Sequence, residues 1–157
     1  MTVCIEPYQS VPLGVRPLVS EMFASIGVSV DWRVWDACPA GVGAIRVRLS
    51  DSSPSMPNSE ALAVARPYEG SIVVFLDRVR EELNRHRGPS VIAHVLVHEI
   101  THVLEGINWH SDTGIMKARW NSNDYGEMCH KPLPFAEEDV GLIYDGLKVR
   151  RAAVARQ

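Results

Sequence analysis

The sequence predicts a single α+β domain over residues 1–157, because helix-like and strand-like apolar patterns occupy separate runs of the chain. Residues 90–105 are apolar nearly all round, which is typical of a helix buried inside a domain. Residues 45–49 alternate apolar with polar side chains, and residues 71–76 form the continuous apolar run of a strand buried on both faces. A chain of 157 residues is long enough for one core and fits one domain.

The remaining elements follow from spacing and from residues that begin or end them. Gly27 suits the end of a first helix, while Ser90 can cap the start of the buried helix and Gly106 its end. In chain order we expect a helix over 16–26, strands over 28–34 and 45–49, a polar loop over 50–59, a short strand from Leu62 that ends at Pro67, a strand over 71–76, a charged helix over 77–87, the buried helix over 90–105, an irregular stretch over 107–133, and an amphipathic helix over 135–154 with Val140, Ile143, Leu147 and Val149 facing inward.

Charge and composition exclude several classes of partner. The net charge of −3 gives no reason to expect nucleic acid or an acidic membrane surface, and no apolar stretch reaches membrane-spanning length. The basic residues near the C-terminus are expected on a solvated helix end; they are Lys148, Arg150, Arg151 and Arg156. The first 14 residues lack the pattern of a signal peptide. We therefore expect a soluble monomer, with the cytoplasm as the favoured location.

The cysteine count adds little to the fold. Cys4, Cys38 and Cys129 lie far apart and form no CxxC pair. An odd number does not indicate a disulfide framework, although one bridge and one free thiol stay open.

The string HEITH at residues 98–102 carries the functional prediction. His98 and His102 are four residues apart, so on a helix their imidazoles lie on one face and can meet one metal ion. A catalytic zinc takes three protein ligands plus water, with nitrogens at about 2.1 Å. Glu99 lies beside that face, where a carboxylate can take a proton from the attacking water and pass it to the leaving group. Burying these polar groups without a partner is costly, which favours a metal over two hydrogen-bonded histidines.

The other histidines are weighed by their distance from this pair. His110 is the candidate third ligand, because Gly106 lets the chain turn back toward the metal after the helix. His94 lies about 12 Å along the axis from His102, and we expect it to be a buried supporting residue. His130 has no further ligand cluster around it in sequence, and His86 lies in a charged run where solvent exposure is expected.

These residues resemble the active-site signature of the metzincin metallopeptidases, particularly the matrixin-like ones. That signature reads HExxHxxGxxH, followed by a serine and by a turn with a methionine below the metal. His110-Ser111 resembles the third ligand and its serine, and Gly114-Ile115-Met116 resembles the methionine turn. The step between the second and third histidines is eight residues here and six in the family, and Gly106 stands one place later than the family's glycine.

The resemblance implies a zincin-like peptidase holding one catalytic Zn²⁺, with His98, His102 and His110 as ligands and Glu99 as general base and acid. The order of elements is also similar to the family: an N-terminal helix, a small twisted mixed sheet with an antiparallel edge strand, the active-site helix, an irregular loop with the methionine turn, and a C-terminal helix. In matrixins the edge strand binds the substrate backbone. By analogy, a peptide or protein substrate would pair with residues near Leu62–Arg66.

Two other interpretations stay open. In gluzincins a glutamate on a later helix completes the zinc site, and an aspartate version is also conceivable; the available carboxylates are Glu127, Glu137, Glu138 and Asp112. The second alternative is a zinc-stabilised binding module without turnover, but a closed structural site would not need Glu99. The aromatic residues Trp109, Trp120 and Tyr125 are expected to pack as core or wall residues.

Overall fold

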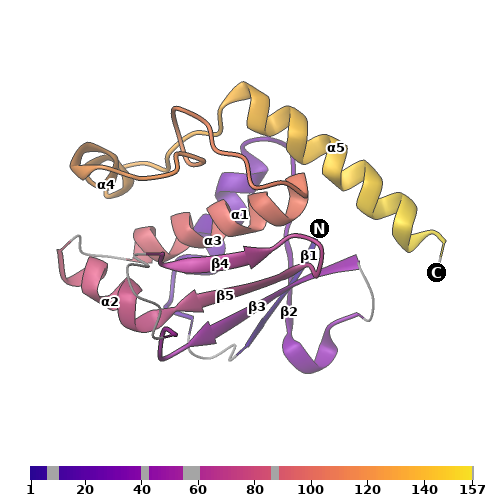
Figure 1. Ribbon diagram of the computed structural model, residues 1–157, viewed down its shortest axis with the longest axis horizontal. Helices are drawn as coiled ribbons and strands as arrows, with labels where there is room; N and C mark the ends of the chain where they lie inside the picture. Colours follow the sequence, from indigo (N-terminus) through magenta and orange to yellow (C-terminus); the bar gives the residue numbers. More distant parts are fainter. Residues whose placement is uncertain (7–10, 40–42, 55–60, 86–88, 157) are drawn as a thin grey trace.

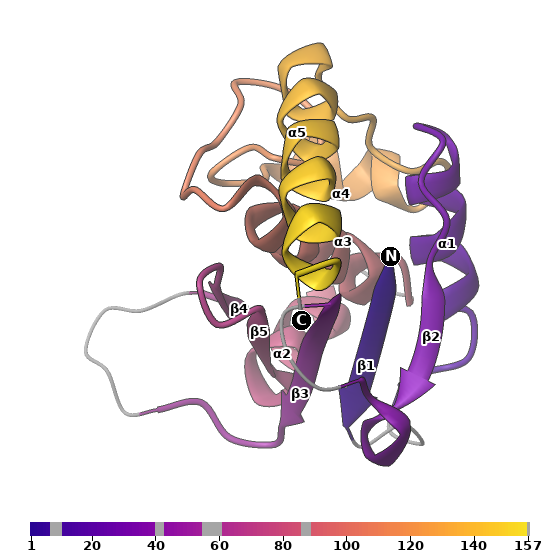
Figure 2. The same ribbon diagram turned by 90° about the vertical axis from the view of Figure 1, so that its right-hand side faces the viewer.

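A five-stranded mixed sheet forms one layer of the protein and helices cover one of its faces (Figures 1 and 2). The structure is a computed structural model that describes residues 1–6, 11–39, 43–54, 61–85 and 89–156, without the side chains of 82–85. In chain order the elements are β1 (Thr2–Glu6), α1 (Val15–Ala24), β2 (Asp31–Val34), the 3-10 helix η2 (Trp35–Ala37), β3 (Ala44–Ser50), β4 (Ala63–Arg66), β5 (Ser71–Phe75), α2 (Leu76–Arg85), α3 (Pro89–Glu105), α4 (Ser122–Met128) and α5 (Glu137–Val154).

The sheet has the strand order β2-β1-β3-β5-β4. Strands β2, β1, β3 and β5 are parallel, and β4 pairs antiparallel with β5, from Ala63 opposite Val74 to Arg66 opposite Ser71. Because β4 has a neighbour on one side only within the described sheet, its outer edge can pair with another chain. The predicted α+β class and the antiparallel edge strand are confirmed.

The core lies between the sheet and the central helix α3. Alternate residues of the parallel strands, such as Val3, Val47 and Val74, are fully buried and face the helical layer. Helix α3 contacts α1 on one side and α5 on the other, and also reaches β4 and β5. Twelve of its seventeen residues are buried, as expected for a helix that is apolar nearly all round.

Three elements are missing from the sequence prediction: the short 3-10 helix η2, strand β1 and helix α4. Strand β1 spans five residues, and Val3, Cys4 and Ile5 are all buried, so no alternation marks it as a strand. Helix α4 lies in the stretch predicted to be irregular. It depends on a polar capping box in which Asn121 accepts from the α4 backbone and Asp124 accepts from the Asn121 N–H, and not on an apolar stripe.

Three details of the prediction are wrong. Strand β2 begins at Asp31 and not at residue 28, since Val28 enters the core from the turn before the strand. Ser90 is not the cap of α3: Pro89 already lies in the helix, and the Ser90 hydroxyl donates to the Met128 carbonyl. Val149 is 66% exposed, because α5 buries only its first half deeply.

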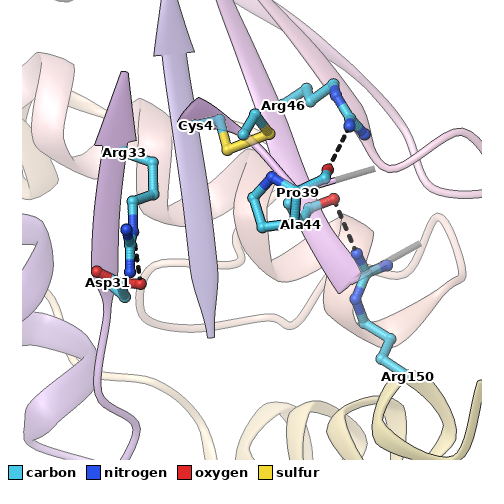
Figure 3. The surroundings of a disulfide bond; sticks show 8 residues. Cys4, Asp31, Arg33, Pro39, Ala44, Arg46 and Arg150 are labelled. Atoms are coloured by element: carbon cyan, nitrogen blue, oxygen red, sulfur yellow. Dashed lines mark hydrogen bonds and ion pairs between the residues drawn. A yellow bond between two sulfur atoms is a disulfide. The ribbon is translucent and has the colours of Figure 1, made fainter. Parts of the chain in front are cut away.

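A disulfide joins Cys4 of β1 to Cys38, just after η2, on the face of the sheet away from the helices (Figure 3). Nearby, the Arg46 guanidinium donates to the Pro39 carbonyl and Arg150 of α5 donates to the Ala44 carbonyl. Arg150 is therefore tied to the sheet, whereas the prediction placed it on a solvated helix end. Among the described residues, no helix is long and apolar enough to cross a membrane.

Candidate metal centre

Helix α3 places His98 and His102 next to each other on one face, with their rings in a T-shaped arrangement. Their Nε2 atoms are 3.1 Å apart and their ring centroids are 4.7 Å apart. Two nitrogens bound to one tetrahedral zinc at about 2.1 Å would be roughly 3.4 Å apart, so the observed spacing matches that of two ligands on one ion. Neighbouring residues of the helix, such as Ile100 and Val103, are buried in the core. Their burial holds the helix in the orientation that places the two imidazoles together.

His110 completes the group, as the sequence predicted for its position. Its ring centroid lies 5.3 Å from that of His98 and 4.8 Å from that of His102. The ligand atoms of the three imidazoles all lie within 4.8 Å of one another. In the part of the chain that the structure describes, this is the one group of three or more histidine, cysteine or acidic residues close enough to hold a metal.

The longer step between the second and third histidines is accommodated outside the site. Gly106 ends α3 with φ +71°, a conformation that glycine adopts at little cost, and its N–H still bonds to the His102 carbonyl. Ile107 and Trp109 are 45% and 48% exposed, so the loop bulges into solvent while His110 turns inward. Trp109 is therefore not a core or wall residue.

The surroundings of His98 and His102 favour the neutral form of both imidazoles, and a hydrogen bond orients His98. Burial lowers the pKa of His98 to about 4, and burial together with the neighbouring His98 and His110 rings lowers the pKa of His102 to about 4. The Nδ1–H of His98 donates to the Ile115 carbonyl at 2.9 Å. That bond places the proton on Nδ1 and leaves Nε2 as an acceptor that faces His102. An unprotonated nitrogen of His98 that faces a second neutral imidazole suits a cation.

Glu99 lies next to the imidazoles and lines the same cleft. Burial raises the pKa of Glu99 to about 7, and a backbone hydrogen bond from Ala65 of β4 partly offsets this rise. A carboxylate with a pKa near neutrality can both take and return a proton at physiological pH. The carboxylate is therefore suited to proton transfer beside an ion held by the histidines.

A turn that contains Ile115 and Met116 adjoins the histidines, because the Ile115 carbonyl accepts from His98. Ile115 and Met116 are fully buried, and the Met116 carbonyl accepts from the Ser111 N–H at 3.0 Å. The Ile115 N–H bonds to the Pro134 carbonyl at 2.9 Å, which ties this turn to the segment before α5. The hydroxyl of Ser111 donates to Asp139 in the first turn of α5. No pattern in the sequence indicates this role for Asp139, which resembles an ordinary first-turn acid.

The other described histidines and the alternative carboxylate ligands lie outside the cluster. His94 is fully buried, donates from Nδ1 to the Ser90 carbonyl at 2.7 Å and accepts from the Leu133 N–H at 3.0 Å, so it is a structural residue. His130 is exposed, and His86 is outside the described residues. The four carboxylates that were alternative ligands are all exposed, and none of them belongs to the histidine cluster; they are Asp112, Glu127, Glu137 and Glu138.

A cleft of about 1330 Å³ opens over the three histidines. One wall is the edge strand β4 and the residues before it, from Ala61 to Ala65, and the opposite wall runs from Lys117 to Ser122 with Tyr125. An ion pair between Lys117 and Asp124, with both side chains about four-fifths buried, braces this second wall against α4.

Comparisons with known proteins agree with this arrangement at the level of the fold. No protein-family model matches the chain, and no curated protein matches it in sequence. A solved structure of a zinc-dependent peptidase from Methanocorpusculum labreanum superposes with a TM-score of 0.60, covering 90% of this chain and 98% of that one. The two sequences are 16% identical, so the likeness shows a shared fold.

Proposed function

We propose that the protein is a zinc-dependent peptidase with His98, His102 and His110 as metal ligands and Glu99 as general base and acid. The observation that carries the proposal is the convergence of three imidazoles beside a partly buried carboxylate in an open cleft. A zinc ion held there would supply Lewis-acid chemistry, activating a water and polarising the scissile carbonyl. The shared fold with a zinc-dependent peptidase supports the same class of reaction.

The residues of the chain divide the remaining work. Glu99 takes a proton from the attacking water and returns it to the amine of the leaving group, a role that its pKa of about 7 favours. The Ile115 carbonyl holds the proton of His98 on Nδ1, which keeps Nε2 directed into the centre. Buried Met116 supports the site from below.

The substrate would be an extended peptide. The outer edge of β4 borders the cleft, and Val64 is 43% exposed along that strand. Backbone pairing to an edge strand binds peptides with little dependence on their side chains. We propose that residues near Leu62–Arg66 pair with the substrate backbone and lay the scissile bond over the histidines.

The decisive experiment combines zinc content with cleavage of a peptide library. Glu99→Gln should keep one zinc per chain and lose activity by about 10²- to 10⁴-fold, because only the proton carrier is removed. A zinc-loaded wild-type protein that cleaves no peptide in the library would contradict the peptidase proposal and favour a zinc-stabilised binding module.

A second pair of variants tests the ligand set. His110→Ala should weaken zinc binding strongly, whereas the matched Asp112→Ala should leave it unchanged, because Asp112 is an exposed side chain outside the cluster. The reverse result in a zinc competition assay would assign the third position to an aspartate.

A further inference from the structure

Trp120 lies where the metal centre meets the wall of the cleft. Its indole Nε1–H donates to the Ile115 carbonyl at 3.2 Å, and the Nδ1–H of His98 donates to the same oxygen at 2.9 Å. Trp120 also lines the cleft and is half-buried against the core. One carbonyl oxygen therefore links a wall residue to an imidazole of the centre.

The shared carbonyl is held by both donors. A carbonyl oxygen has two lone pairs, and the two N–H groups occupy both. The same peptide segment is anchored by the bond from the Ile115 N–H to the Pro134 carbonyl at 2.9 Å. Since both acceptor positions are filled, loss of the indole donor would leave His98 alone to orient this buried carbonyl.

The ring of Trp120 also contacts the imidazole directly. Its centroid lies 5.6 Å from that of His98 in a T-shaped arrangement, and 6.3 Å from that of buried His94. The ring of Tyr125 lies 6.2 Å from that of Trp120, again T-shaped. Edge-to-face contacts at these distances are favourable and directional, so they restrict rotation of the imidazole.

The backbone of Trp120 is fixed by its neighbour. Asn121 is the N-cap of α4, and its side chain accepts from the Asn123 and Asp124 N–H groups at 2.8 and 3.2 Å. The Asp124 carboxylate in turn binds Lys117, which follows Met116 directly. The loop that carries the indole is thus held in place by hydrogen bonds and an ion pair.

We propose that Trp120 is a positioning residue for His98: it sets the direction of Nε2 through the shared Ile115 carbonyl and through ring packing. The inference rests on the proposed zinc site and adds to it a residue that touches neither the ion nor the reacting atoms. Partners that orient a metal-binding histidine typically contribute about 10- to 100-fold to metal affinity.

The test compares two Trp120 variants with a matched control. Trp120→Phe keeps an aromatic ring but loses the N–H bond, and Trp120→Leu loses both contributions. Trp32→Phe is the control, because Trp32 is also partly buried and donates its indole N–H at 2.9 Å, to Ser20 and far from the centre in sequence and fold. Each protein is checked for native far-UV circular dichroism and titrated with zinc against a chromophoric chelator, then with Co²⁺ followed by its visible absorption.

We expect Trp120→Phe to bind zinc about 10-fold more weakly than the wild type and Trp120→Leu more weakly still. Both variants should show an altered Co²⁺ spectrum, while Trp32→Phe should match the wild type in both assays. Wild-type zinc affinity and an unchanged Co²⁺ spectrum in both Trp120 variants would overturn the inference and leave the zinc site standing. A wild-type protein that binds no zinc would overturn the site and the inference together, so the two failures are distinguishable. If Trp120→Leu loses its native circular dichroism, the zinc affinity and Co²⁺ spectrum of Trp120→Phe alone decide the outcome, by the same criteria.

Discussion

At the scale of single residues, the sequence indicates the metal-binding motif but not the residues that hold it in place. The string HEITH alone predicts that His98 and His102 share a helical face with Glu99 beside it, because a period of 3.6 fixes their relative positions. Trp120 and Asp139 reach the centre only through loops and hydrogen bonds that no periodicity encodes. Their roles follow from the packing of segments far apart in sequence, which a pattern along the chain cannot show.

Gly114 is a residue whose conformation the centre requires. It has φ +73°, and a Cβ added there would meet the Pro134 carbonyl oxygen at 2.3 Å. Gly114→Ala should therefore lower the free energy of unfolding by about 2 kcal/mol or more. Gly106→Ala is the control: φ is +71° but no described atom lies within 4 Å of the added Cβ, so only the backbone cost of about 1 kcal/mol remains. Equal losses for the two variants in urea unfolding would contradict the steric argument.

Glu105 gives a prediction for pH. Burial, and then the carboxylate of Asp139, raise the pKa of Glu105 to about 8 from an ordinary 4.5, and both carboxylate oxygens are buried without a hydrogen-bond partner among the described residues. The folded protein holds this proton where the unfolded chain releases it, so the contribution of Glu105 to stability is greatest below pH 4.5 and falls as pH rises toward 8. Glu105→Gln cannot ionise, so the variant should not lose this contribution to stability as pH rises.

Thermal unfolding of both proteins at about pH 5 and about pH 8, each saturated with zinc, measures this effect. The variant's advantage in melting temperature should be larger at the higher pH. An advantage that is the same at both pH values would mean that Glu105 does not change its protonation on unfolding.

At the scale of elements, the close crossing of α3 and α5 requires a glycine at position 146. A Cβ at Gly146 would lie 1.6 Å from the Leu104 carbonyl oxygen, so the two helices approach here as closely as backbones allow. Gly146→Ala should destabilise the fold by about 3 kcal/mol or more, because one helix must move. Gly141→Ala, on the same helix with open space around it in the described structure, should instead stabilise by about 0.5–1 kcal/mol. Opposite signs in the two variants are the expected result of chemical denaturation.

The elements that the sequence predicted well are those with a clear apolar pattern. Helix α3 and strand β3 have the expected positions within a few residues, since each buries a long, regular set of side chains. Strand β1 escaped prediction because it is buried on both faces and short, and α4 because a polar cap defines it. Which strand lies at the edge was not readable from periodicity. It came from the family resemblance, and the antiparallel pairing of β4 with β5 confirmed it.

At the scale of the whole molecule, the disulfide is expected to stabilise the fold without taking part in the metal centre. Cys4 and Cys38 are 34 residues apart, and the bridge lies on the face of the sheet away from the helices. Closing a loop of this length stabilises a fold by about 3–4 kcal/mol, mainly by restricting the unfolded chain.

Replacing both bridged cysteines with alanine should therefore lower the free energy of unfolding by about 3–4 kcal/mol and leave zinc affinity unchanged, because the bridge lies on the face of the sheet away from the helices, whereas His98 and His102 lie on helix α3. Cys129→Ala is the control, since Cys129 is exposed and free, and it should change stability by less than about 0.5 kcal/mol. Urea unfolding of the three proteins, each followed by a zinc competition assay, measures both quantities. A loss of zinc affinity in the double variant while the chain is still folded would show that β1 transmits strain through the core to α3, and that the sheet and the centre are one mechanical unit.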